Sequence, residues 1–266
     1  MFFEAVKIAI VRRVGEWFPR IWMERELRFR PNHFEREFLL VSIFCDREKI
    51  AIDVGANEGT YSYYMKKFSR KVIAFEPNID LWKKLRRLLG GDCRLESAAL
   101  SGKSSRATLR VDRSNTGIST IEEKNDLSCT ANKETIISRE VETRTLDSYN
   151  IIDVAMIKID VEGHEEAVVE GAFATIQRNR PVLLIESEDR HNFGAPRRLA
   201  ETFAKLDYMV FYVKDRKLLE FDTLLPDDTD PENLSGSGST YVNNFIYIPA
   251  ERDTLIRRAQ ALLTSH

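Results

Sequence analysis

Four carboxylate residues stand at or near the carboxyl ends of short apolar segments, and their positions predict a binding site. They are Asp53, Glu76, Asp160 and Glu186. If the segments are parallel strands of one sheet, neighbouring strands lie ~4.8 Å apart and the acids share the edge at which open α/β sheets bind ligands. Buried carboxylates are costly unless they are paired or hydrogen-bonded. Packing alone is therefore a weak explanation for four acids along one edge, although acidic residues also cap helices.

The first of these acids opens a glycine-spaced turn. Residues 51–62 read AIDVGANEGTYS, in which an apolar strand runs into the turn GANEG and then into a helix that Thr60 can cap. Glycines allow the backbone to approach a ligand closely, and a helix start after such a turn offers N–H groups and positive potential. The third glycine of G-x-G-x-x-G is missing, so a dinucleotide pyrophosphate has no evident seat. The predicted cofactor contacts in this segment are Asp53, Gly55, Ala56, Asn57 and Gly59.

Glu76 follows the second apolar strand, where an acidic side chain can accept both ribose hydroxyls of a nucleoside. Pro77 comes next, and Ser97 and Ala98, at the end of a third predicted strand, are expected to border the base. A ligand that joins a nucleoside to an amino acid fits these features better than a dinucleotide does. S-adenosylmethionine is such a ligand, because its carboxylate suits the N–H groups of the turn and its sulfonium suits an acidic rim.

Methyl transfer to an alcohol requires alignment of the two reactants and a base or metal that assists the hydroxyl. His164, just past the fourth strand, is the first candidate for the base because its usual pKa is ~6.5, although a histidine at a helix start is often only a cap. Asp160, which is also an expected cofactor contact, is the alternative, either as proton acceptor or as the group that orients the base. Mg²⁺ would suit the oxygens of Asp160, Glu186 and Glu188, but they form no clear ligand cluster and we predict no metal. The expected contacts of the acceptor are Glu186, Glu188, Ser119 and Asn244.

The composition limits the partners and the compartment. The chain has 266 residues, with 40 basic and 42 acidic side chains and a formal net charge of −2, so no basic stripe for nucleic acid is implied. Cys45, Cys93 and Cys129 fit no zinc or redox spacing, which favours a reducing cytoplasm. No apolar segment approaches the ~20 residues that a membrane span needs. We predict a cytoplasmic protein of one α/β domain with appendages.

The first 25 residues form a separate feature. Apolar residues recur there at intervals of three and four, and basic residues mixed with Glu4 and Glu16 lie on the other face, which is the pattern of an amphipathic helix. The apolar positions are Phe3, Val6, Ile10, Val14, Trp17 and Ile21. Packing on the chain's own domain or on a partner, including a second copy, is the first interpretation. Peripheral attachment to the inner face of a membrane is the alternative.

Strand and helix patterns alternate along the rest of the chain, which predicts a mainly parallel sheet with helices on both faces. The predicted strands are residues 49–54, 71–77, 93–100, 154–160, 181–188, 208–213 and 241–249, and the predicted helices are residues 60–68, 78–91, 164–179, 196–206 and 252–263. Residues 101–150 interrupt the alternation with two short strands around a polar segment. The predicted units are an N-terminal lead-in (1–45), a main domain (46–250, with the insertion 101–150) and a C-terminal helix (251–266).

Five segments occur in an order and spacing that resemble the FkbM family of S-adenosylmethionine-dependent methyltransferases. They are IDVGANEGTYS, FEPN, IKIDVEGHEEAVVEGA, PVLLIESE and NNFIYIP. The resemblance implies a Rossmann-like class I methyltransferase fold, with seven strands in the order 3-2-1-4-5-7-6. It also implies S-adenosylmethionine as cofactor and O-methylation of a hydroxyl on a sugar, glycan, glycolipid or secondary metabolite. Within the block KIDVEGHE, Asp160, Glu162 and His164 match the family signature and are the catalytic candidates.

Two other functions stay open at this point. A nucleic-acid methyltransferase that acts on a base needs a pocket for a flipped base, and the sequence has neither a basic stripe nor an Asn/Asp-Pro-Pro-aromatic tetrapeptide. A binding module with a decayed site does not need the turn or the block DVEGHE, and both are intact. We therefore expect a small-molecule or glycan acceptor and no nucleic-acid partner.

Overall fold

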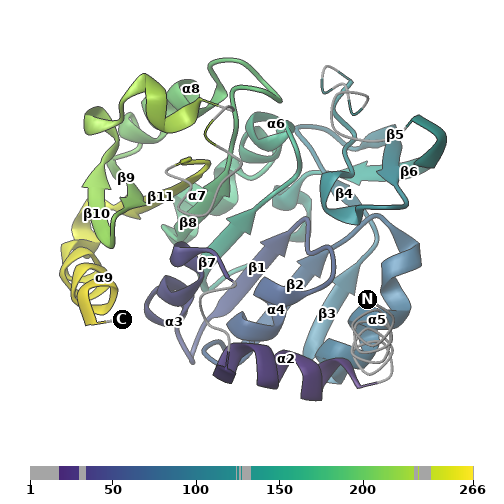
Figure 1. Ribbon diagram of the computed structural model, residues 1–266, viewed down its shortest axis with the longest axis horizontal. Helices are drawn as coiled ribbons and strands as arrows, with labels where there is room; N and C mark the ends of the chain where they lie inside the picture. Colours follow the sequence, from purple (N-terminus) through teal and green to yellow (C-terminus); the bar gives the residue numbers. More distant parts are fainter. Residues whose placement is uncertain are drawn as a thin grey trace, which may run out of the picture.

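A computed structural model of the chain describes residues 18–29, 34–123, 125, 127, 133–230, 233 and 241–265. These residues form an eight-stranded sheet with helices on both faces and a smaller three-stranded sheet at one side (Figure 1). The lead-in helix predicted from the first 25 residues lies, up to residue 17, outside the described residues. None of the described helices is both long enough and apolar enough to span a membrane.

The large sheet has the strand order that the family resemblance implies, with one strand more. From edge to edge the strands are β10 (Lys217–Glu220), β9 (Tyr208–Lys214), β11 (Asn244–Pro249), β8 (Val182–Glu186), β7 (Val154–Ile159), β1 (Ile50–Val54), β2 (Lys71–Phe75) and β3 (Cys93–Glu96). The strands from β8 to β3 are parallel, and β11 runs antiparallel between β8 and β9. An additional edge strand, β10, pairs with β9. The predicted Rossmann-like fold is confirmed, with eight described strands in place of seven.

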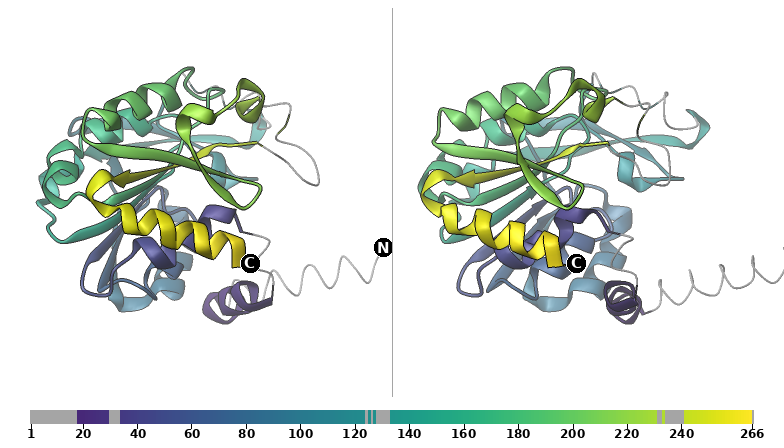
Figure 2. Two further views of the ribbon diagram at one scale, coloured as in Figure 1. Left: turned by 90° about the vertical axis from the view of Figure 1, so that its left-hand side faces the viewer. Right: turned by 60° about the vertical axis from the view of Figure 1, so that its left-hand side comes forward.

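Different helices cover the two faces of the large sheet (Figure 2). One face is covered by α2 (Pro19–Phe29), α3 (Val41–Phe44), α4 (Thr60–Met65), α5 (Trp82–Leu89) and α9 (Asp253–Ser265), and the other by α6 (Glu165–Glu170), α7 (Phe173–Asn179) and α8 (Ala195–Ala204). Side chains along a strand alternate between the faces, so in β1 Ala51 packs into the first core and Ile52 into the second. Burial on both sides explains why these strands are continuous apolar runs in the sequence.

The insertion folds as the second sheet, in the order β4 (Ala99–Leu100), β6 (Ile136–Arg144), β5 (Ser105–Asp112). Both strands predicted inside residues 101–150 are therefore confirmed. The single strand predicted over residues 93–100 is wrong, because β3 ends at Glu96 and β4 belongs to the other sheet. Backbone pairing explains the change of sheet: the Glu96 carbonyl accepts from the N–H of Glu76, whereas the N–H of Ser101 donates to Arg144.

The helix predicted over residues 164–179 is two helices, α6 and α7, and Asp147 explains the break. The backbone N–H of Asp147 donates to the Gly171 carbonyl at 2.9 Å. Its carboxylate accepts from the N–H groups of Ala174 and Thr175, at 2.9 and 2.7 Å, and so caps a new helix start. A residue distant in sequence thus ends one helix and begins the next.

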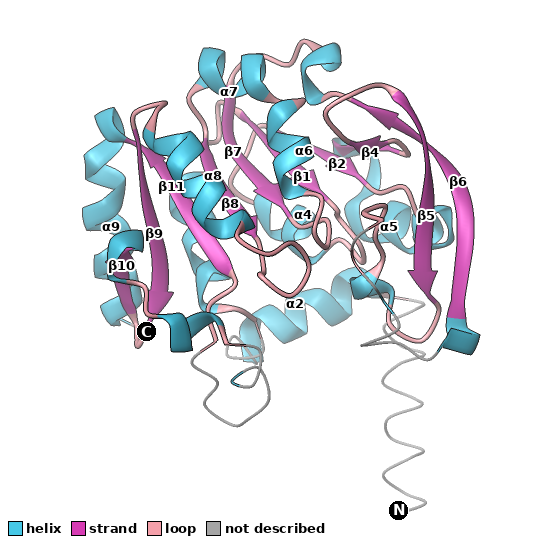
Figure 3. Ribbon diagram, turned by 90° about the horizontal axis from the view of Figure 1, so that it is seen from above, coloured by secondary structure: helices cyan, strands magenta, loops and turns pink. Residues whose placement is uncertain are grey.

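The strand ends hold the four acids of the predicted rim. Asp53 is the penultimate residue of β1 and Glu186 is the last residue of β8, while Glu76 and Asp160 directly follow β2 and β7. Because these four strands are neighbours and parallel, their carboxyl ends share one edge of the sheet (Figure 3).

Candidate active site

Two adjoining pockets open at this edge of the sheet, and both are lined by Gly55, Asn57, Gly117 and Asp160. The apolar pocket, which extends to Glu76 and Glu162, has about 610 Å³ of empty space counted to its open mouth, within the range of small-molecule sites. The polar pocket extends the other way. Its further lining residues include Asp53, Ala56, Glu58, Thr60, Tyr61, Ser114, Asn115 and Lys158.

The turn between β1 and α4 is held by the backbone of its neighbours. The N–H groups of Gly55 and Ala56 both donate to the Phe75 carbonyl at 3.0 Å. Gly55 has a φ of 81°, and a Cβ there would lie 1.8 Å from the Asp160 carbonyl oxygen. Position 55 therefore admits only glycine. Gly55 thus approaches the end of β7 closely, and it also lines both pockets. Gly59, with a φ of 88°, occupies the cap position before α4 that was predicted for Thr60, and Thr60 is the first residue of the helix.

Asp53 and Glu76 are both buried, but they accept hydrogen bonds from different kinds of donor. Asp53 Oδ2 accepts from the Ser62 hydroxyl at 2.5 Å, which ties α4 to β1. Glu76 Oε2 accepts from the Asn57 N–H and its Oε1 from the Asn78 N–H, each at 2.7 Å. Burial raises the pKa of Glu76 to about 7, although the two backbone donors act against the rise. Two fixed donors leave the remaining lone pairs of the Glu76 carboxylate in a set orientation.

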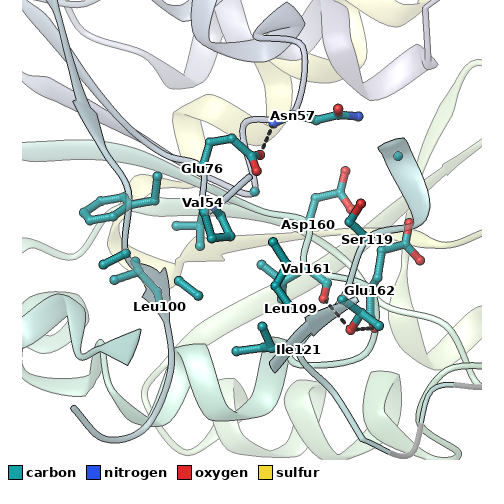
Figure 4. Close-up of a pocket in the computed structure, with 17 residues that line it drawn as sticks. Val54, Asn57, Glu76, Leu100, Leu109, Ser119, Ile121, Asp160, Val161 and Glu162 are labelled. Carbon is teal, nitrogen blue, oxygen red and sulfur yellow. Dashed lines mark hydrogen bonds between the residues drawn. The ribbon is translucent and has the colours of Figure 1, made fainter. Parts of the chain in front are cut away.

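The walls of the apolar pocket come from both sheets. Figure 4 shows Leu100, Leu109 and Ile121 gathered at one end, with Glu76 and Asp160 beyond them. The other apolar lining residues include Pro77, Ala98 and Val161. Of the two residues predicted to border a base, Ala98 lines the pocket and Ser97 does not. Ser119 lines it too, so the insertion is a wall of the site.

Lys158 is the functional candidate that sequence reasoning missed. Its side chain is 1% exposed yet lines the polar pocket, and its Nζ lies 3.2 Å from Asn244 Oδ1, 3.6 Å from Glu186 Oε2 and 3.8 Å from Asp160 Oδ2. The ammonium also faces the Tyr61 ring, 5.1 Å from its centroid. Burial alone would lower the pKa of Lys158, but the carboxylates of Asp160 and Glu186 raise it above its usual value.

The two carboxylates beside Lys158 differ in access. Burial raises the pKa of Asp160 and of Glu186, with Lys158 acting against the rise in both. Asp160 lines both pockets, whereas Glu186 lines neither and accepts from the Asn243 side chain at 2.7 Å. Asn244 was expected to contact the acceptor. It lies behind Lys158 instead, 3% exposed, and bonds to side chains.

His164, the predicted base, lines neither pocket. Its Nδ1 lies 2.9 Å from Glu122 Oε2 and its Nε2 lies 2.9 Å from Ser101 Oγ, so both ring nitrogens are engaged. Glu122 belongs to the insertion, and His164 stands at the start of α6. This geometry does not favour His164 as the base. It makes His164 the link between the insertion and the turn after β7.

Two further acids have partners of their own. Glu162 lines the apolar pocket, 3.1 Å from His191 Nδ1, and burial raises its pKa to about 9. Such a rise favours the protonated form of Glu162 over the carboxylate that a general base requires. Glu188, a predicted acceptor contact, is 3% exposed and binds Arg190 and the Tyr241 hydroxyl, outside both pockets. In the described part of the chain, no group of three or more His, Cys, Asp or Glu side chains is arranged to hold a metal ion.

Comparison with known proteins identifies the family. The sequence matches the family described as "Methyltransferase FkbM domain" over residues 53–217, which is more than half of the chain. The chain belongs to the FkbM methyltransferase family. The matched segment of this FkbM protein runs from Asp53 through the block KIDVEGHE to the start of β10. No curated protein matches the sequence.

Solved structures resemble this FkbM protein at low sequence identity. Methyltransferase FkbM from Methylobacillus flagellatus KT shares 15% identity with a TM-score of 0.48, over 84% of this chain and 47% of that one; this chain thus spans about half of that relative. An rRNA methylase from Streptococcus thermophilus shares 14% (TM-score 0.42, 83% and 95% covered). Precorrin-6y C5,15-methyltransferase from Geobacter metallireducens GS-15 shares 11% (TM-score 0.44, 80% and 87% covered). At such identities a likeness reaches no further than the fold.

Proposed function

We propose that this FkbM protein transfers a methyl group from S-adenosylmethionine to a hydroxyl of a polar acceptor: a sugar, a glycan, a glycolipid or a hydroxylated metabolite. The junction of the two pockets supports this most strongly. The oriented carboxylate of Glu76 borders the apolar pocket, Lys158 borders the polar pocket, and Asp160 borders both. The apolar pocket then holds the nucleoside and the polar pocket the acceptor.

The residues of the apolar pocket fit a nucleoside. Glu76 can accept hydrogen bonds from the two ribose hydroxyls, because each of its oxygens accepts only one bond from the protein, from the N–H of Asn57 or of Asn78. Pro77, Leu109 and Val161 offer apolar surfaces to a flat base. When it is bound, S-adenosylmethionine supplies a methyl group on a positively charged sulfur, which is a strong electrophile. The acids along this edge suit such a cation.

Asp160 is the proposed proton acceptor. It is the carboxylate that reaches both pockets, and its side chain is one-third exposed, so an acceptor hydroxyl can contact it. Burial raises the pKa of Asp160 above the usual value of an aspartate, which makes it a stronger base. The Lys158 ammonium, at 3.8 Å, keeps the ionised form accessible. Asp160 receives the hydroxyl proton as the acceptor oxygen takes up the methyl group.

The polar pocket favours a polyhydroxylated acceptor. Its lining from α4 and the insertion supplies hydroxyl and amide groups, among them Thr60, Tyr61, Ser114 and Asn115, which suit sugar hydroxyls. A nucleic acid is disfavoured because the chain has a formal net charge of −2 and nucleic-acid affinity rests on cationic contacts to phosphates.

Calorimetric titration with S-adenosylmethionine tests the nucleoside half of this proposal. Glu76→Ala should lose about 10- to 100-fold in affinity, because hydrogen bonds to a charged group contribute about 1.5–3 kcal/mol. Glu140→Ala, which removes an exposed carboxylate paired with Arg106 on the insertion, is the matched control and should bind as the wild type does. Failure of the folded wild type to bind would reject the proposal.

Release of S-adenosylhomocysteine in the presence of candidate sugars and hydroxylated metabolites tests the acceptor half. Asp160→Asn should lower turnover by about 100-fold or more, since that is the usual contribution of a general base, with a smaller loss of cofactor affinity. Unchanged turnover would remove Asp160 from this role. Salt-sensitive retention of RNA or duplex DNA by the wild type would favour the nucleic-acid alternative.

A further inference from the structure

Helix α2 presents apolar side chains both to the protein and to solvent. Its inner positions, Pro19, Met23 and Glu26, are buried. Successive helical residues are separated by 100°, so Ile21 and Phe29 fall on a different side from these three. Both are exposed, by 65% and 68%, and Phe18, directly before the helix, is exposed by 57%.

The exposed residues form one surface rather than a scatter. Among the described residues, eight large apolar side chains are exposed, and three of them are Phe18, Ile21 and Phe29. Arg25 and Arg28 are exposed on the same side of the helix. We call these five residues the outer face of α2. Figure 1 shows α2 at the margin of the molecule, where nothing in the described chain lies beyond it.

Contacts with the body hold this face in place. Arg20 Nε donates to the Leu88 carbonyl at the end of α5, at 2.9 Å. On the side of α4, the Tyr63 hydroxyl donates to Glu24 Oε1 at 2.6 Å, and Lys67 pairs with the same carboxylate at 2.7 Å. Ile21 and Phe29 therefore do not turn inward, and the outer face is a preformed surface.

We propose that the outer face of α2 docks on the surface of an anionic lipid bilayer. The combination of aromatic and aliphatic side chains with arginines is the chemistry of a helix that lies in a membrane interface. Phe18, Ile21 and Phe29 enter the boundary between headgroups and acyl chains, and Arg25 and Arg28 pair with lipid phosphates. The preceding sequence adds Lys7, Arg12 and Arg13 against two acidic residues, so charge along the chain matches an anionic surface. This proposal does not rest on the proposed methyl transfer.

Co-sedimentation of the full chain with vesicles tests it. Vesicles of phosphatidylcholine with one-third phosphatidylglycerol should bind the wild type at least about tenfold more tightly than phosphatidylcholine alone, because each interfacial arginine contributes about 1 kcal/mol. The double variants Ile21→Asp/Phe29→Asp and Arg25→Glu/Arg28→Glu should each lose about tenfold or more in affinity. Phe193→Asp is the matched control, since Phe193 is 85% exposed before α8, and it should bind as the wild type does.

Three results would overturn this assignment. The first is that the wild type does not bind anionic vesicles, and the second is that both α2 variants bind them as tightly as the wild type does. The third is that light scattering shows a wild-type dimer, that Ile21→Asp/Phe29→Asp abolishes this dimer, and that vesicles are not bound. The outer face of α2 would then be a contact between two copies of the chain. Circular dichroism and the thermal midpoint test whether the variants are folded. We expect them to be folded, because the substituted side chains are exposed. Because no residue of α2 lines either pocket of the candidate active site, binding of S-adenosylmethionine should be unchanged in every variant.

Discussion

Lys158 is a fully buried cation in a strand whose other residues are apolar, and its neighbours explain why it stays charged. Two carboxylates, one amide oxygen and one aromatic face surround the ammonium. The desolvation of a buried ion is repaid only by close and well-oriented partners. Asp160 and Glu186 therefore stabilise the charged form of Lys158, and Lys158 in turn lowers the pKa of the proposed base.

Removing this cation should move the pH dependence of the reaction. In Lys158→Met the positive charge that lowers the pKa of Asp160 is lost, so the pKa of this carboxyl should rise further and a smaller fraction of it should be ionised at a given pH. We expect turnover at neutral pH to fall about 100-fold and the optimum to move to higher pH. Rate-against-pH profiles measure both effects.

Lys158→Arg is the conservative control for that variant. It keeps the charge, so its optimum should stay close to that of the wild type even if the longer side chain slows the reaction. Breaking a buried pair costs about 3–5 kcal/mol, and chemical denaturation must show that the methionine variant is folded. An unshifted optimum in a folded Lys158→Met protein would contradict the role given to Lys158.

Single residues were predictable when their signal was local. Glu76 and Asp160 were found because each ends an apolar strand, and Lys158 could have been found as a lysine inside VAMIKID. His164 could not have been placed, because Glu122 and Ser101 lie 42 and 63 residues away in the sequence. A histidine can serve either as a general base or as a structural link, and only the position of its hydrogen-bond partners distinguishes the two roles.

At the scale of elements, the insertion is clamped to the turn after β7. Besides the His164 link, the Glu162 carbonyl accepts from Thr120 Oγ1 and from the Asn125 side chain, each at 2.8 Å. The Arg110 guanidinium, from β5, donates to the Glu122 and Asn125 carbonyls. These bonds hold the segment that walls the apolar pocket.

Loosening the clamp should weaken cofactor binding more than catalysis. In His164→Ala the link to Glu122 is lost, and we expect affinity for S-adenosylmethionine to fall about tenfold, since hydrogen bonds to charged groups are worth about 1.5–3 kcal/mol. Turnover at saturating cofactor should change less. Calorimetry and saturation kinetics separate the two, and the reverse pattern would restore His164 as the base. Glu122→Gln keeps an acceptor for His164 Nδ1 and should retain most of the affinity.

The elements themselves were predictable where a periodic pattern sufficed. Apolar runs predicted seven of the eight described strands of the large sheet, missing β10, and the resemblance to the FkbM family implied the strand order. The split of residues 93–100 between two sheets and the break between α6 and α7 were not predictable, because both depend on tertiary partners, Arg144 and Asp147. Local pattern gives the existence of an element, and distant contacts set its ends.

At the scale of the whole molecule, buried acids make stability depend on pH. Burial raises the pKa of Glu37, Glu76 and Glu165 to about 7 and that of Glu162 to about 9. In the unfolded chain these carboxyls titrate near pH ~4.3. Between the two values the folded protein binds more protons than the unfolded chain, so the free energy of unfolding falls as pH rises.

We therefore expect the cofactor-free protein to lose stability between about pH 6.5 and about pH 8.5, by ~2 kcal/mol or more. Urea denaturation at the two pH values measures it. Glu37→Gln cannot ionise at that position, so its stability should fall less over the same range. A wild-type stability that is flat or rising over this range would contradict the raised pKa values of these buried acids.

The place of β11 has a consequence for how the protein is made. β11 lies between β8 and β9, yet its residues follow those of every other described strand in the sequence. During synthesis the half of the sheet that contains Gly55 and Glu76 can assemble while the ribosome is still at work. The partner that Lys158 finds in Asn244 arrives only with the final strand. Until then Lys158, Asp160 and Glu186 lie at an unpaired edge of β8, so the residues of the proposed nucleoside pocket can assemble before the surroundings of the proposed base are complete.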